Sequence, residues 1–390
     1  MIREQLSQIC LGLLLIGSLG CQPASEPEQE PDAEVTIERV VPQFEVDPSW
    51  PMLPNDWVLG SVASVDVDSR DHVWIYHRPR SVDEAQQANA APAVIELDPD
   101  GNFVQAWGGP TWNQEQSVLD TSYGSANVAD SAGWDSPEDW PTQEHGIFID
   151  HEDNVWVGGN GSSDHVVLKF TPDGEHLLTI GQWNETRGSN DTQRLGRPAD
   201  VTVDIETNEL YVADGYGNRR VIVFDANTGE YRRHWGAYGN VPDDTADISN
   251  LSFQNPSWHS PVHAVRISND GLVYVADRGG SRIHVFDKDG TFVQEGVFAP
   301  WTIVQGSAWD IELSRDPEQQ WIFAADGANM KVWILRREDF EVVGSFGRGG
   351  RQAGQFNWVH NITADSFGNL YTAEVNTGKR IQKFVPIATN

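Results

Sequence analysis

DVTVDIETNELYVADGYGNRRVIVFDANTGEYRRHWG, residues 200–236, is the clearest copy of a unit that recurs along the chain and decides its fold. A second copy, AVRISNDGLVYVADRGGSRIHVFDKDGTFVQEG, occupies residues 264–296. In each copy a first alternating run ends at Asp204 or Ser268, and a second run ends in Tyr-Val-Ala-Asp after a turn. Alternation with a period of two, broken by clusters of Asp, Asn and Gly, predicts antiparallel strands joined by hairpins.

Four further copies bring the number to six. They begin near Ser64 (SVDVDSRDHVWIYHR), Gly146 (GIFIDHEDNVWVGG), Asp310 (DIELSRDPEQQWIFAADG) and Asn361 (NITADSFGNLYTAE). No window of comparable length shows helical periodicity. Six four-stranded units that close into a ring predict an all-β fold, a six-bladed β-propeller, whose closure protects the edges of its sheets.

The last copy ends after its third strand, shortly before the C-terminal residue Asn390. An apolar segment from Val40 to Val46 stands ahead of the first copy. We therefore expect this segment to supply the missing fourth strand, to pair with the strand around residues 380–385 and to close the ring. On this interpretation the propeller occupies residues 35–390.

Composition excludes several classes of protein. The chain has 390 residues, of which 39% are hydrophobic and 10% aromatic, enough apolar material for a large core. A formal net charge of −32 makes nucleic acid and anionic lipid surfaces poor partners. The two cysteines, Cys10 and Cys21, stand near the N-terminus, so the body has neither a disulfide scaffold nor a cysteine-ligated metal.

The N-terminus has the pattern of an export signal. The apolar run from Ile9 to Leu19 is too short to span a bilayer, which takes about 20 residues, but has the length of a signal-peptide core. The run ends in Ser18-Leu19-Gly20-Cys21, which resembles a bacterial lipoprotein signal over residues 1–21. The Pro- and Glu-rich residues 22–34 then form a flexible tether. We expect a lipid anchor on the periplasmic or outer-membrane face of the cell envelope; the alternative is ordinary secretion.

One column of the repeat carries histidine in alternate copies. Five positions before the end of the first strand stand, in order, Ala63, His145, Ala199, His263, Trp309 and His360. The first strand of each blade lines the axis, so equivalent residues in alternate blades lie about 120° apart and should converge. Three convergent histidines without a fourth protein ligand are typical of a catalytic zinc site with an open position. The alternative is three separate polar residues that line the channel.

A second column lies at the end of the second strand. It holds Arg78 in the first copy and Arg278 in the fourth, and Tyr216 follows this column by one residue in the third. The first two strands of a blade are antiparallel, so these side chains should lie at the same rim as the histidines. A guanidinium fork matches a carboxylate, which favours substrate binding over the alternative of surface ion pairs.

Three long connections between blades lead to the same rim and should build a binding cleft. They run over residues 108–144, 181–197 and 236–261, and they contain Trp112, Trp134, Trp140 and Trp258.

These residues together resemble a known family, the peptidyl-α-hydroxyglycine α-amidating lyases, which form the lyase half of peptidylglycine α-amidating monooxygenase. The style of the repeat is that of NHL repeats over roughly residues 60–385. The matching stretches are Glu144-His145-Gly146-Ile147, Pro261-Val262-His263-Ala264, Trp358-Val359-His360-Asn361, Ala-Asp-Gly-Tyr ending at Tyr216, Tyr-His-Arg ending at Arg78 and Ala-Asp-Arg ending at Arg278.

The resemblance implies a zinc ion on His145, His263 and His360, a catalytic Tyr216, and active-site arginines Arg78 and Arg278. It also implies a calcium ion in the channel, held by the backbone carbonyls of Val65 and Ile147 and by the side chain of Asn361. Asn361 replaces the family's Asp, which removes a charged ligand, although an amide oxygen can still coordinate calcium.

The activity implied by the resemblance is zinc-dependent cleavage of the C–N bond of a peptidyl-α-hydroxyglycine-like carbinolamide to an amide and glyoxylate. The partner would be a small-molecule or peptide substrate with a carboxylate. We expect a monomer that binds no nucleic acid and meets the membrane only through its lipid anchor. The alternative is a non-enzymatic NHL-repeat propeller whose rim binds a peptide, glycan or protein. A propeller enzyme with a calcium channel is a third interpretation, but it would use carboxylates at the axis.

The lipoprotein interpretation predicts that Cys21→Ala releases the protein from the cell envelope, because the acyl chain needs the thiol. Cell fractionation and metabolic labelling with a fatty-acid probe measure this, and Cys10→Ala is the matched control that should stay anchored. A Cys21→Ala variant that is still acylated would contradict the interpretation.

Overall fold

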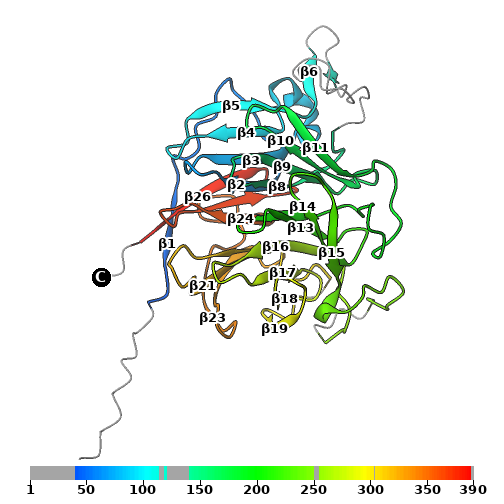
Figure 1. Ribbon diagram of the computed structural model, residues 1–390. Coiled ribbons are helices and arrows are strands. Elements are labelled where there is room, and N and C mark those ends of the chain that lie inside the picture. Colours follow the sequence, from blue (N-terminus) through cyan, green and yellow to red (C-terminus); the bar gives the residue numbers. More distant parts are fainter. Residues whose placement is uncertain (1–39, 114–117, 121–139, 250–253, 303, 388–390) are drawn as a thin grey trace, which may run out of the picture. The chain divides into compact units, whose positions relative to one another are not determined.

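Six four-stranded antiparallel sheets make up most of the computed structural model, which describes residues 40–113, 118–120, 140–249, 254–302 and 304–387 (Figure 1). Blade one contains β2 (Ser61–Val67), β3 (Val73–Arg78), β4 (Val94–Leu97) and β5 (Phe103–Trp107); blade two contains β8 (Glu144–Ile149), β9 (Val155–Gly159), β10 (Val166–Phe170) and β11 (His176–Gly181). Blade three contains β12 (Asp200–Asp204), β13 (Glu209–Asp214), β14 (Arg220–Asp225) and β15 (Tyr231–Trp235); blade four contains β16 (Val262–Ile267), β17 (Val273–Asp277), β18 (Arg282–Phe286) and β19 (Phe292–Val297).

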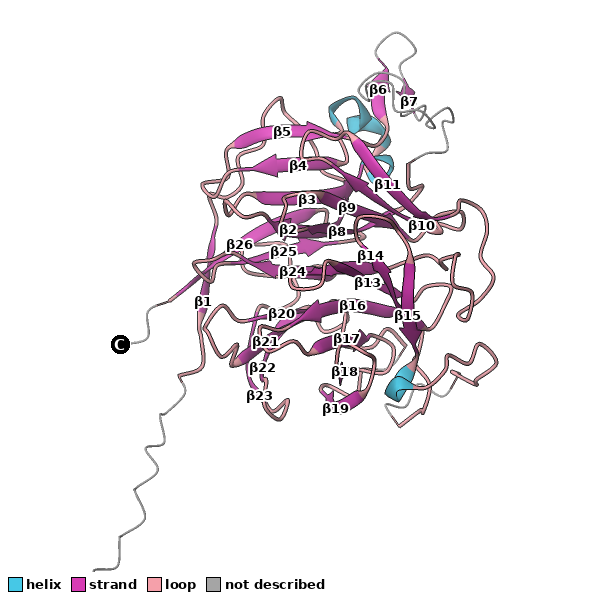
Figure 2. Cartoon of the chain, viewed as in Figure 1, coloured by secondary structure: helices cyan, strands magenta, loops and turns pink. Residues whose placement is uncertain are grey.

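Blade five contains β20 (Asp310–Leu313), β21 (Trp321–Asp326), β22 (Lys331–Arg336) and β23 (Val342–Phe346). Blade six is built from both ends of the propeller, β24 (Val359–Ala364), β25 (Leu370–Glu374), β26 (Arg380–Pro386) and β1 (Phe44–Asp47). Outside the blades lie the hairpin β6 (Thr111–Asn113) and β7 (Val118–Asp120) and the short 3-10 turns η1 (Pro79–Ser81), η2 (Glu84–Asn89) and η3 (Ala237–Gly239) (Figure 2). The predicted all-β, six-bladed propeller is confirmed.

The first strand of each blade is its innermost strand. β2, β8, β12, β16, β20 and β24 contact one another in turn, and β24 returns to β2. The ring is therefore closed around an axis lined by these six strands.

The expected closing strand is present. β1 pairs antiparallel with β26, with Val46 opposite Phe384 and Glu45 opposite Val385. The strand begins at Phe44 rather than at Val40, two residues after Pro42, whose ring nitrogen has no hydrogen to donate to a ladder.

The Asp that directly follows the first strand of several blades has a structural role. Asp68 accepts a hydrogen bond from the indole Nε1 of Trp74 at 3.1 Å, and Asp150 accepts the same bond from Trp156 at 2.9 Å. In blade six the hydroxyl of Tyr371 replaces the indole and donates to Asp365 at 3.0 Å. In blades one, two and six this column therefore ties the first hairpin to a buried aromatic side chain.

Side chains of the inner strands also tie neighbouring blades together. A carboxylate in each odd-numbered blade accepts a hydrogen bond from a backbone N–H of the next blade, and burial makes such a bond costly to lose. The pairs are Asp66 with Ile149 (2.7 Å), Asp200 with Val265 (3.1 Å) and Asp310 with Ile362 (2.9 Å).

The predicted signal and tether, residues 1–21 and 22–34, lie outside the described residues. Within the described part of the chain, no helix is long and apolar enough to cross a membrane.

Candidate metal centre

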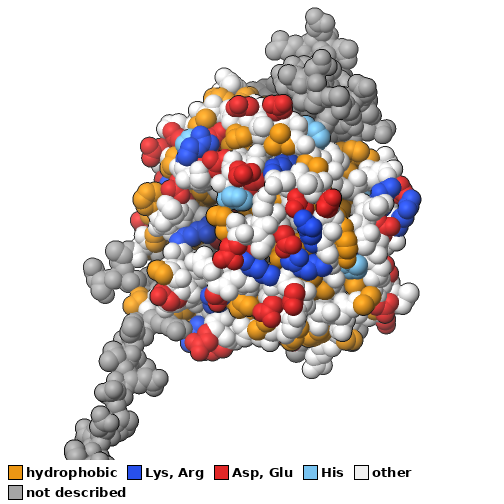
Figure 3. Space-filling model, in the orientation of Figure 1, with side chains coloured by type: hydrophobic (Ala, Val, Ile, Leu, Met, Phe, Trp, Pro, Cys, Tyr) orange, Lys and Arg blue, Asp and Glu red, His pale blue; other side chains and the backbone are white. Residues whose placement is uncertain are grey.

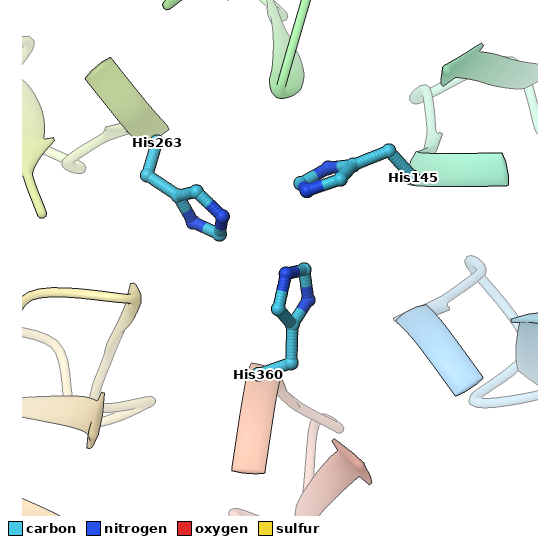
Figure 4. A group of neighbouring side chains, drawn as sticks. All are labelled: His145, His263 and His360. Atoms are coloured by element: carbon cyan, nitrogen blue, oxygen red, sulfur yellow. The ribbon is translucent and has the colours of Figure 1, made fainter. Parts of the chain in front are cut away.

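The three histidines of the repeat column stand at β-bulges. In blade four, Val262 pairs with Asp277 and Ala264 with Ala276, which leaves His263 as an extra residue. In blade six, His360 is likewise an extra residue without a partner in the strand pairing. In blade two, the register between β8 and β9 shifts across His145. A bulge bends the strand and turns the extra side chain out of the regular alternation. Here it turns each imidazole toward the axis, as Figure 4 shows.

Three imidazoles surround one point on the axis, those of His145, His263 and His360. Each offers a ring nitrogen within 4.8 Å of the others, and the ring centroids are 4.8 to 5.0 Å apart. All three side chains are buried. Among the described residues, one other group of this kind exists, Asp68 with His72 and Glu96, but the guanidinium of Arg70 already pairs with both of its carboxylates.

Backbone carbonyls of the intervening blades fix each ring. The Nδ1 atom of His145 contacts the carbonyl oxygen of Ala199 at 2.7 Å, and that of His360 contacts Ala63 at 2.6 Å. His263 makes the corresponding bond to Trp309. A carbonyl oxygen can only accept a hydrogen bond, so Nδ1 carries the proton and the Nε2 lone pair faces the centre.

Burial keeps these rings neutral, the form that binds a metal. It lowers the pKa of His360 to about 3 and holds the pKa values of His145 and His263 well below their ordinary value, with Arg78, Arg278 or a neighbouring imidazole adding to the effect. Three Nε2 lone pairs therefore point at one place. In the described part of the chain the Nε2 of His360 has no hydrogen-bond partner, which fits a shared cation as the missing partner.

Tyr216 reaches the same place from the third blade. Its hydroxyl lies 2.9 Å from the Nε2 of His145 and 3.1 Å from the Nε2 of His263. A hydroxyl has one hydrogen and can donate it to only one of these nitrogens. The preceding Gly215 is required at this turn, because a Cβ there would lie 2.0 Å from the carbonyl oxygen of Val262.

Arg278 and Arg78 lie beside the histidines, as the repeat predicted. The Nη1 of Arg278 donates to the hydroxyl of Tyr216 at 3.2 Å, and the guanidinium lies over the ring of Trp309 at 4.6 Å. The Nε of Arg278 is buried without a partner. Arg78 donates from Nε to the carbonyl oxygen of Glu144 at 2.7 Å, and burial lowers its pKa.

Neither arginine has a carboxylate partner within the described ranges. This is unusual in a chain with a net charge of −32, whose buried arginines Arg220 and Arg282 pair with Asp214 and Asp277. Figure 3 shows basic side chains lying among acidic ones on the face that it presents. Unpaired guanidinium groups beside a metal centre leave room for an anionic ligand.

Two residues of the site were missed from the sequence. Arg197 lies in the loop before β12, with its guanidinium 5.7 Å from the ring of Tyr216 and its Nε on the carbonyl oxygen of Asn160 at 2.8 Å. It occupies no repeat column, so the sequence carries no signal for it. Trp309 stood in the histidine column, but its contact with Arg278 follows from a side-chain direction that the repeat does not encode.

The tryptophans of the long connections do not form a cleft where they are described. Trp140 is buried against Tyr76 and Trp107, and its Nε1 donates to Glu144 at 3.1 Å. Trp258 is buried, and its Nε1 donates to the Nδ1 of His284 at 3.0 Å. Both are therefore core residues. Trp134 lies outside the described residues, and the side chain of Trp112 is not described.

The one side chain expected to bind calcium, that of Asn361, is already bound to protein partners. The Oδ1 of Asn361 accepts the N–H of Val65 at 2.7 Å, and its Nδ2 donates to Asp310. Both ends of the amide are thus committed to protein partners. Ile147 lies on the same ring of inner strands, in β8. The guanidinium of Arg266 lies on the other side of Asp310.

Comparison with known proteins identifies the repeat and several relatives. A family model of the NHL repeat matches residues 195–224 and 262–286. Peptidyl-glycine alpha-amidating monooxygenase B of Xenopus laevis is 29% identical over 375 residues, which cover 94% of this chain and 37% of the relative. Peptidyl-alpha-hydroxyglycine alpha-amidating lyase 1 of Drosophila melanogaster is 25% identical over 386 residues, or 93% of this chain and 63% of the relative. The chain thus spans about a third to two thirds of these relatives.

A third relative has a different kind of name. NHL repeat-containing protein 3 of Homo sapiens is 26% identical over 361 residues, which cover 88% of this chain and 84% of the relative. Among solved structures, a streptogramin B lyase superposes with a TM-score of 0.51 at 15% identity over 88% of this chain and 98% of the other, which supports the fold alone. The chain is a six-bladed β-propeller with NHL repeats, and its homologues include proteins named as α-hydroxyglycine amidating lyases.

Proposed function

We propose that the protein is a zinc-dependent lyase that cleaves the C–N bond of an N-acyl-α-hydroxyglycine to a primary amide and glyoxylate. The observation that carries the proposal is the meeting of three neutral imidazoles, a tyrosine hydroxyl and an unpaired guanidinium at one point. The similarity to proteins named as amidating lyases supports the same reaction class.

His145, His263 and His360 would hold the zinc through Nε2. When bound, zinc supplies a Lewis acid that polarises an oxygen of the substrate. The chain contributes the arrangement of the ligands, because each Nδ1–H is already held by a carbonyl and each ring is held in one orientation.

The substrate carries a carboxylate, a hydroxyl and an amide nitrogen on one carbon. Arg278 binds the carboxylate, since its guanidinium has no carboxylate partner in the described part of the chain and lies against Trp309. Tyr216 takes the proton of the substrate hydroxyl as general base. The C–N electron pair leaves with nitrogen, the C–O bond becomes the carbonyl of glyoxylate, and nitrogen regains a proton to give the amide.

Two cations stabilise this proton transfer. The Nη1 of Arg278 lies 3.2 Å from the phenolic oxygen of Tyr216, where it can stabilise the phenolate that accepts the substrate proton. Arg78 is positioned by the carbonyl of Glu144, next to His145 in the sequence, and adds a second positive charge at the site. Arg278 and Arg78 thus supply positive charge both for the substrate carboxylate and for Tyr216, the general base.

The second candidate is a propeller that binds a partner without chemistry. The similarity to NHL repeat-containing protein 3, over most of that protein's length, favours it. A binding module does not need three neutral imidazoles that share a centre with a tyrosine, so we prefer the lyase.

We also propose that the protein is exported and works as a monomer on small-molecule or peptide substrates. The apolar run that ends at Cys21 supports export. The acidic net charge argues against nucleic acid as a partner.

The proposal predicts about one zinc per chain in protein purified without chelators, and its loss in His263→Ala. Elemental analysis of the purified protein measures this. His151→Ala is the matched control, because His151 is exposed on a turn of blade two and should leave the metal content unchanged. Folded wild-type protein that takes up no zinc from zinc-containing buffer would contradict the metal assignment.

Tyr216→Phe should lower turnover by about 10²–10⁴, the usual contribution of a general base, while zinc content and melting temperature stay near those of the wild type. Release of glyoxylate from α-hydroxyhippurate or a peptidyl-α-hydroxyglycine is the assay. Tyr231→Phe is the control, since this tyrosine lies on the outer strand β15 and contacts His234. A zinc-loaded wild type that releases no glyoxylate would favour the binding module.

Arg278→Gln should raise KM by roughly 10- to 100-fold for substrates with a free carboxylate, the range of a lost charged hydrogen bond. The methyl ester of the same substrate should be turned over by wild type and variant with similar KM values, because it lacks the charge that Arg278 binds. Equal losses for acid and ester would remove Arg278 from carboxylate binding.

A further inference from the structure

Charged side chains of the inner strands form a layer around the axis, three positions along the strands from the histidine column. Three positions after the histidine column stand Asp66 in blade one, Arg266 in blade four and Glu312 in blade five. A cavity of about 380 Å³ opens beyond this layer, lined by the far ends of the inner strands and by these three side chains. Arg266 is the basic member of the layer, and its side chain is only 13% exposed.

The guanidinium of Arg266 is bound on every side. Its Nη2 lies 3.1 and 3.2 Å from the two carboxylate oxygens of Asp310, and its Nη1 donates to Asp200. Its Nε lies 3.7 Å from Glu312, and Nη1 also donates to the carbonyl oxygen of Val265 at 2.8 Å. One planar cation thus joins acidic groups of blades three and five from the blade between them.

The same network contains Asn361, the residue whose side chain was expected to bind calcium. Asp310 accepts hydrogen bonds from the Nδ2 of Asn361 and from the N–H of Ile362, besides its pair with Arg266. The Oδ1 of Asn361 is bound to the N–H of Val65. The amide of Asn361 therefore links blade six to blades one and five. The positive charge near it is the guanidinium of Arg266, a group of the protein and not a bound ion.

We propose that Arg266 takes the place of a structural calcium ion in the channel, so that the propeller closes its ring and keeps its stability without calcium. Calcium would need oxygen ligands free of other partners, six to eight of them in usual sites. Asp200 and Asp310 already face a guanidinium, and Glu312 also lies 3.4 Å from Arg315. The proposal concerns the ring and does not depend on the proposed reaction.

The first experiment uses the wild-type, zinc-loaded protein. After dialysis against calcium and then against calcium-free buffer, elemental analysis should find no calcium retained in proportion to protein. Addition of about 5 mM CaCl2 should move the melting temperature by less than about 1 °C, whereas a site with micromolar affinity would raise it by several degrees. One bound calcium per chain, or such a rise, would overturn the proposal.

The second experiment removes the internal cation. Arg266→Gln should lower the melting temperature by roughly 5 °C or more, because it leaves buried carboxylates without their partner. Calcium should restore part of this loss in the variant, since the vacated space is lined by Asp200 and Asp310. Arg315→Gln is the matched control: its side chain is 40% exposed, shares Glu312 and should cost less than about 1 °C.

An Arg266→Gln variant as stable as the wild type would contradict the role of the guanidinium. If that variant does not fold, Arg266→Lys keeps the charge but not the fork and should show an intermediate loss. Whether or not the variant folds, the calcium content and melting temperature of the wild type test whether Arg266 replaces the ion.

Discussion

Hydrogen bonds from each inner strand to the next blade are the constraint on which the rest of the structure depends. Carboxylates join blades one to two, three to four and five to six. Imidazoles join blades two to three, four to five and six to one, through Nδ1 of His145, His263 and His360. The six junctions thus alternate between an acid and a histidine. Each histidine uses Nδ1 to close the ring, and its Nε2 faces the centre that the three imidazoles share.

This double use explains the electrostatics of the site. The rings stay neutral because burial disfavours the charged imidazolium, and the positive charges of Arg78 and Arg278 nearby disfavour it further. The arginines in turn have no carboxylate partner in the described part of a strongly acidic chain. Positive charge therefore collects at the point where an anionic substrate would meet the metal, while the remaining charge of the protein favours solubility.

The features that could be predicted from the sequence are those that depend on positions recurring in every copy of the repeat. The blade count, the closing strand and the meeting of His145, His263 and His360 follow from columns, because equivalent positions in a closed ring face one axis. Contacts outside the columns do not follow. Arg197 reaches Tyr216 from an irregular loop, and Trp140 turns into the core instead of lining a cleft, because side-chain direction in a loop depends on packing that no period describes.

Asn361 shows how the fold can engage a side chain that a resemblance assigns to an ion. The amide has a donor and an acceptor, and the fold uses both, toward Asp310 and Val65. A carboxylate there would meet the N–H of Val65 as well, but would repel Asp310 unless a cation lay between them. An amide at this position and a guanidinium at Arg266 are therefore consistent with each other. Together they link blades three, four, five and six through groups that belong to the protein itself.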